Sequence, residues 1–186
     1  MAKIRRPVTF STCYGIDTKR MADLGVLDPI LNVDTKLFID PMLVRQSKHP
    51  RMSRDATQSF RRYFEEIIKL LLASKTVGDV AWRQAAKRLD FREIKWTCLG
   101  YGASSINGRR SGTALASTLV KTAKEIVDLG ITDPDLFSLL PLLEDGVGPD
   151  LISDLTTRTI IVDLAAFTED VSKTLAVPTR EFELSD

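Results

Sequence analysis

Four carboxylates gather around two glycines and a proline in the segment EDGVGPDLISD, residues 144–154. A divalent cation such as Mg²⁺ binds converging carboxylate oxygens, completes its shell with water, and supports phosphoryl chemistry. The segment therefore predicts a metal site at Asp150 and Asp154. It also predicts one possible function for the whole protein, metal-dependent phosphodiester hydrolysis of the nuclease type, with Glu144, Asp150 and Asp154 as the catalytic residues.

The same acids are also the residues that the start of a helix selects. In a helix that begins near Pro149, Asp150 lies in the first turn, where the helix dipole favours a negative charge. Asp154 and Arg158 are then spaced as an i,i+4 pair. Helix-start chemistry without a metal is therefore the competing interpretation of this segment.

A second candidate site is the glycine-rich stretch LGYGASSINGRRSGT, residues 99–113, which precedes a predicted helix. Free N–H groups at a helix start attract an anion, and the two arginines add positive charge. We therefore expect a phosphate-bearing ligand here, either a nucleotide or a nucleic acid. The spacing matches neither the P-loop nor the GxGxxG pattern, so an exposed loop with solubilising arginines is the alternative. The expected ligand-binding residues are Tyr101, Gly102, Ser104, Ser105, Gly108, Arg109, Arg110 and Ser111.

Cysteine and histidine are scarce, which limits the chemistry they can support. The sequence has two cysteines, Cys13 and Cys98, and one histidine, His49. This set lacks the spacing of a metal site and disfavours a zinc centre or a Ser-His-Asp triad. A nucleophilic cysteine needs a nearby base or positive charge, and no local pattern connects Cys13 with His49. We expect Cys13 to be a small buried thiol.

The composition is that of a globular protein with a useful hydrophobic core. Of its 186 residues 44% are hydrophobic and 27% are charged, and the net charge is +1. A charge so close to zero creates no general attraction to nucleic acid, so such binding needs a local basic patch. No signal peptide and no membrane-spanning apolar run is evident. We expect a cytosolic protein with one helical domain, 1–178, and a short polar tail, 179–186.

Hydrophobic periodicity and capping residues predict a mainly α fold with two or three short strands. The clearest helix starts near Ser53, where apolar residues recur at three- and four-residue steps to Leu71. Asp79 is placed to cap a helix over 80–88, and Asp40 a shorter one that starts at Pro41. Further helices are expected at 18–24, ending at Gly25, at 113–129, ending at Gly130, and after Asp133-Pro134. The candidate strands are 35–39 and a second one that begins near Phe91 and ends at Gly100.

The segment 149–175 carries two apolar stripes on nearly opposite faces. Either one helix is buried on both sides, or the helix breaks around Thr156-Thr157 and turns both stripes inward. Without such a break, one stripe needs cover from outside the chain, because soluble monomers rarely expose a contiguous apolar patch. We then expect a homo-oligomer or a partner polypeptide, and a non-catalytic structural or interaction module is a further alternative for the function. The interface residues would be Ile160, Leu164, Phe167 and Val171.

Three segments together carry a resemblance to a known family: LFIDP at 37–41, LGYG at 99–102 and GVGPDLISDLTT at 146–157. The chain resembles a family of uncharacterised bacterial proteins in which a G-(I/V)-G-P-D-x-I-S-D segment leads into a long helix. The resemblance runs from about Leu31 to Pro178 and implies a long helix after Pro149. It also suggests a role in bacterial conflict with phages or mobile elements. Members continue beyond the position of Pro178, which implies a longer protein or a second polypeptide.

Overall fold

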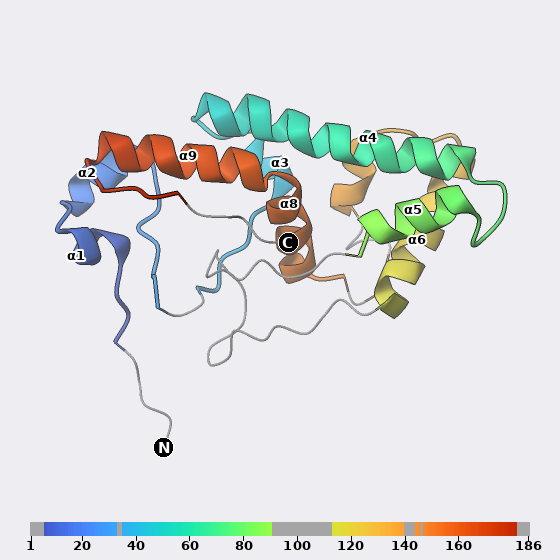
Figure 1. Ribbon diagram of the computed structural model, residues 1–186, viewed down its shortest axis with the longest axis horizontal. Helices are drawn as coiled ribbons and strands as arrows, with labels where there is room; N and C mark the ends of the chain where they lie inside the picture. Colours follow the sequence, from blue (N-terminus) through green and yellow to red (C-terminus); the bar gives the residue numbers. More distant parts are fainter. Residues whose placement is uncertain (1–5, 33–34, 91–112, 140–143, 146, 182–186) are drawn as a thin grey trace, which may run out of the picture.

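Helices make up nearly all the regular structure in the computed structural model, which describes residues 6–32, 35–90, 113–139, 144–145 and 147–181 (Figure 1). Within those ranges no segment forms a strand, and an isolated antiparallel bridge pairs Thr9 with Ile30. The expectation of a mainly α fold is confirmed. None of the described helices is long and apolar enough to cross a membrane. The helices are α1 (Phe10–Tyr14), α2 (Thr18–Asp23), α3 (Pro41–Val44), the π-helix η1 (Arg51–Ala56), α4 (Thr57–Ala73), α5 (Val80–Arg88), α6 (Thr113–Asp128), the 3-10 helix η2 (Pro134–Leu139), α8 (Pro149–Thr159) and α9 (Ile161–Thr174).

The central helix is α4, against which α5, α6, η2 and α8 pack. Phe64 lies at the middle of this packing and is fully buried. Its ring stacks on that of Phe137 in η2, with centroids 4.3 Å apart and an interplanar angle of 26°. The apolar stripe predicted from the sequence is therefore the face that builds the core. Its buried members in α4 are Phe60, Phe64, Ile67, Ile68 and Leu71.

The predicted helix starts and stops are confirmed where capping residues specified them. The carboxylate of Asp79 accepts a hydrogen bond from the backbone N–H of Trp82 at 2.7 Å. Asp40 does the same for Met42 at 2.8 Å, with Pro41 as the first helical residue. Gly25 ends α2 with φ of 66°, a backbone conformation that L side chains rarely adopt.

The strand predicted at 35–39 is wrong. Thr35 is a single bridge residue, and the residues from Leu37 to Ile39 have no strand pairing. The backbone N–H of Ile39 instead donates to the hydroxyl of Ser153 on α8 at 2.9 Å, and Ile39 packs against the core. Packing against a helix has overridden the β-propensity of this segment. The other predicted strand, 91–100, lies outside the described residues.

The segment 149–175 forms two helices that meet at Ile160, where φ is −109° and ψ is 18°. The break therefore falls after Thr156-Thr157 and not at this pair. The hydroxyl of Thr156 donates to the carbonyl of Ile152 at 2.7 Å, and that of Thr159 to the carbonyl of Leu155 at 2.7 Å. These bonds to the preceding turn allow threonines to remain within a helix.

Because of the break, most apolar side chains of both stripes turn inward, whereas Val162 remains 71% exposed. Leu155 and Ile160 are fully buried, α8 packs on α4, and α9 packs on η1. Leu164 and Phe167 are partly buried against the same core. Ile160 is therefore not available for a subunit interface, and its place in the predicted interface is wrong. An oligomer that uses the remaining residues stays a prediction.

The N-terminal segment, residues 6–32, forms its own hydrogen-bonded unit at the far end of α9 (Figure 1). Phe10 N–H donates to the carbonyl of Pro29 at 2.9 Å, and Leu31 N–H to that of Val8 at 2.8 Å. The main hydrophobic core contains none of its residues. The segment is joined to α9 by a hydrogen bond from Arg20 to the carbonyl of Thr174 at 3.3 Å.

Candidate functional site

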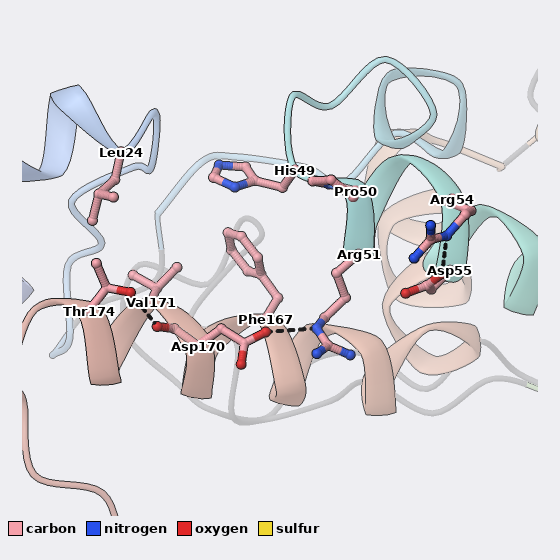
Figure 2. Close-up of a pocket in the computed structure, with 10 residues that line it drawn as sticks. All are labelled: Leu24, His49, Pro50, Arg51, Arg54, Asp55, Phe167, Asp170, Val171 and Thr174. Carbon is pink, nitrogen blue, oxygen red and sulfur yellow. Dashed lines mark hydrogen bonds and ion pairs between the residues drawn. The ribbon is translucent and has the colours of Figure 1, made fainter.

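A groove of about 380 Å³ lies between the N-terminal segment, η1 and α9 (Figure 2). One wall is the turn His49-Pro50 and the start of η1, the facing wall is α9, and Leu24 closes one end. Ligand sites in proteins are commonly hollows of roughly this size or larger, lined by apolar side chains and a few polar groups. This groove has both kinds of lining. Its apolar end is formed by Leu24, Phe167, Val171 and the ring of His49, and its charged end by Arg51, Arg54, Asp55 and Asp170.

The π-helix η1 supplies both arginines of the groove. Pro50 precedes it, which suits a helix start because proline has no N–H to leave unpaired. The carbonyl of His49 then accepts from the N–H groups of Met52 and Ser53, each at 2.9 Å. A π-helix is rare and is frequently found at functional sites. Its position beside the groove therefore directs attention to Arg51 and Arg54.

At the apolar end, the rings of Phe167 and His49 meet edge to face. Their centroids are 4.9 Å apart, with an interplanar angle of 67°. Nε2 of His49 is buried and has no hydrogen-bond partner among the described residues. It faces Gly25, where an added Cβ would come within 3.9 Å of it. A buried polar atom without a partner is costly, so this nitrogen is suited to a water or a ligand as its partner.

At the charged end, each arginine is paired with a carboxylate through its Nε. Arg51 Nε lies 2.9 Å from Asp170 Oδ2, and Arg54 Nε lies 2.8 Å from Asp55 Oδ1. The hydrogen bond from Arg54 holds the pKa of Asp55 below its usual range, and the same bond raises the pKa of Arg54. A guanidinium has five N–H donors, so the Nη groups remain available to a further acceptor. The groove therefore has a net charge close to zero but offers many hydrogen-bond donors.

The glycine-rich stretch cannot be compared with this groove, since residues 91–112 lie outside the described part of the chain. What the structure does describe is the helix that follows. α6 begins at Thr113, as predicted, and runs to Asp128. The predicted ligand-binding residues themselves therefore stay predictions. They are Tyr101, Gly102, Ser104, Ser105, Gly108, Arg109, Arg110 and Ser111.

Glu144 lies apart from the start of α6, because its carboxylate accepts a hydrogen bond from the hydroxyl of Thr122. Thr122 is nine positions after Thr113, which corresponds to about 13 Å along a helix axis. Asp150 is in the first turn of α8, as the helix-start interpretation predicts, and Asp154 is half-buried one turn later. No group of three or more His, Cys, Asp or Glu side chains in the described residues is placed to hold a metal ion. The two-carboxylate metal site at Asp150 and Asp154 remains a hypothesis.

The expectation that Cys13 is a buried thiol is wrong, because Cys13 is exposed. α1 is one turn and a half long, and it buries Ser11 instead. Ser11 donates to Asp28 through its N–H at 2.8 Å and its hydroxyl at 2.5 Å. Cys13 lies two positions further, about 200° around the helix, and so points to the opposite side.

Sequence analysis missed the groove because its residues come from three distant parts of the chain. Arg51 and Asp170 are 119 positions apart. One local signal was present, His49-Pro50-Arg51, in which the only histidine precedes a proline and a basic residue at a helix start. Nothing in that tripeptide indicates which segment faces it.

The described residues thus form a mainly helical domain with an amphipathic groove where the N-terminal segment meets α9. A family described as "Domain of unknown function (DUF8370)" matches residues 15–186, and the chain belongs to that family. The resemblance found in the sequence to an uncharacterised family is thereby confirmed. Neither a curated protein nor a solved structure matches the chain.

Proposed function

We propose that this protein is a binding domain for a phosphate-bearing ligand, a nucleotide or a nucleic acid, and that the groove holds this ligand. The observation that carries the proposal is that two arginines on one π-helical turn line the same groove as an aromatic ring, Phe167, on the facing helix (Figure 2). Arginine is the side chain best suited to phosphate, because its planar guanidinium presents several donors in fixed directions.

The apolar end supports a ligand that carries more than phosphate. Phe167, Val171 and Leu24 offer a surface for a flat or apolar group. Bases stack on aromatic side chains, with about 1–3 kcal/mol lost per base when the ring is removed. Nε2 of His49, which has no partner among the described residues, adds a polar atom at the same end. A nucleoside phosphate matches both ends of the groove.

Binding of AMP, GMP, CMP, UMP and a short oligo(dT) at low salt tests the proposal directly. Isothermal titration calorimetry with the full chain should detect at least one of them. The double variant Arg51→Ala, Arg54→Ala should weaken that binding and flatten its dependence on salt, because two phosphate contacts are lost. Absence of binding to every probe in the wild-type protein would overturn the proposal.

A matched control separates the groove from general basic charge. Arg62 and Arg83 are exposed and do not line the groove. Their double replacement by alanine removes the same charge. Measured at about 0.15 M salt, it should leave the affinity within about two-fold, because distant exposed charges are then largely screened. An equal loss in both double variants would mean that the ligand is held by overall charge and not by this groove.

A third double variant, Arg109→Ala, Arg110→Ala, tests the glycine-rich stretch as the location of the site. If it alone abolishes binding while Arg51 and Arg54 can be replaced freely, the ligand class stands and the site lies in 99–113. If the η1 variant alone abolishes binding, the groove is the site.

A further inference from the structure

We infer that Asp170 is a built-in competitor for the ligand, which occupies Arg51 and yields it only when a phosphate replaces its carboxylate. The inference rests on the proposed function and adds a regulating residue to the same groove. The bond from Arg51 Nε to Asp170 Oδ2, at 2.9 Å, joins η1 to α9 across the charged end (Figure 2).

The two charged pairs of the groove differ in what they connect. Arg54 and Asp55 are sequence neighbours on one helical turn, so their contact holds no two elements together. Arg51 and Asp170 come from the two facing walls. A phosphate that takes the two parallel hydrogen bonds offered by Nε and one Nη of Arg51 therefore meets Asp170 on Nε. For this bidentate contact the carboxylate of Asp170 is the group that must leave.

Asp170 can leave without disturbing the core. Its side chain is 55% exposed and that of Arg51 is 40% exposed, so both can return to water. On the next turn Thr174 donates its hydroxyl to the backbone carbonyl of Asp170 at 2.9 Å, a contact that does not involve the carboxylate. The helix stays intact while the side chain changes partner.

The expected size of the effect follows from competition. While Asp170 holds Arg51, the protein cannot make this contact with the ligand. The apparent affinity is therefore the intrinsic affinity multiplied by the fraction of molecules in which Arg51 is free. For an ion pair as exposed as this one, removal of the carboxylate should tighten binding by about two- to six-fold.

Asp170→Asn tests this directly, with affinity for AMP and oligo(dT) measured by calorimetry. Glu169→Gln is the matched control, because Glu169 is adjacent, exposed and paired with Lys173 outside the groove. Both variants remove one negative charge from α9, yet only Asp170→Asn should tighten binding. Asp170→Ser should do the same, which would show that loss of the charge matters and not the new amide.

Two further readouts distinguish competition from a structural role. In an Arg51→Ala background the gain from Asp170→Asn should vanish, because there is no arginine left to release. The salt dependence of oligo(dT) binding should also become steeper, because in the wild-type protein salt weakens the competing Arg51–Asp170 pair as well as the contact between arginine and phosphate. A gain that persists without Arg51 would overturn the inference.

Failure of the inference can be told apart from failure of the proposed function. If the wild-type protein binds a probe through Arg51, and Asp170→Asn has no effect on affinity, the function stands and the competitor role is wrong. If neither the wild-type protein nor Asp170→Asn binds any probe, both are wrong.

Discussion

Replacement of Ile160 by alanine tests whether the junction of α8 and α9 belongs to the core of a single chain. Ile160 is fully buried and lies between the two helices. The change removes three carbons, worth about 0.8 kcal/mol each in transfer free energy, and leaves a cavity that adds to the loss. We expect the free energy of unfolding to fall by about 3–4 kcal/mol. For a chain of this size that lowers the melting temperature by roughly 6–16 °C.

Urea unfolding followed by circular dichroism, at low and high protein concentrations, measures this loss. Val162, two positions further, is 71% exposed, and Val162→Ala should change stability by less than about 0.5 kcal/mol. Ile160→Val, which removes one carbon, should cost about 1 kcal/mol. A loss below about 1 kcal/mol for Ile160→Ala, or a loss that depends on protein concentration, would refute burial within one chain and favour a subunit interface.

Three further predictions follow from the structure and the sequence. Hydrogen bonds from the backbone N–H groups of Trp82, Lys75 and Thr76 lower the pKa of Asp79 to about 2. The contribution of this carboxylate to stability is therefore present above its ordinary pKa of 3.8 and is lost as the pH falls toward 2. Asp79→Asn should remove this part of the acid denaturation curve. The metal hypothesis predicts that Mg²⁺ or Mn²⁺ raises the melting temperature and that Asp150→Asn with Asp154→Asn abolishes the rise; equal shifts in both proteins would rule the site out. The oligomer hypothesis predicts a dimer in light scattering that Phe167→Asp dissociates, whereas a wild-type monomer at micromolar concentration would contradict it.

Local signals in the sequence predicted the elements that depend on local chemistry. The cap at Asp79 and the left-handed Gly25 are set by one or two residues and their neighbours, and both were found where expected. The stripe through Phe64 identified the central helix, because the 3.6-residue period alone determines which side chains share a face. The break in 149–175 was one of two alternatives, and it falls at Ile160 because Thr156 and Thr159, whose hydroxyls bond back to the preceding turn, remain within α8.

The candidate site could not be predicted in the same way, because it depends on tertiary contacts. The π-helical turn places Arg51 toward α9, and only the folded chain brings Asp170 and Phe167 to meet it. Likewise, Cys13 is exposed because Ser11 on the same short helix takes the buried position against Asp28. Composition made a buried thiol reasonable, yet a five-residue helix has only one face to bury.

The separate hydrogen bonding of residues 6–32 has a consequence for how the groove responds to its surroundings. A unit that shares no residue with the main core can unfold alone, at a free energy below that of the whole protein. Leu24 would then leave, and the groove would lose one end while α4 to α6 remained folded. Amide protons of α2 should therefore exchange with solvent faster than those of α4. A bound ligand that touches both walls would slow the exchange in α2. Hydrogen exchange in this helix would then show whether the groove holds a ligand.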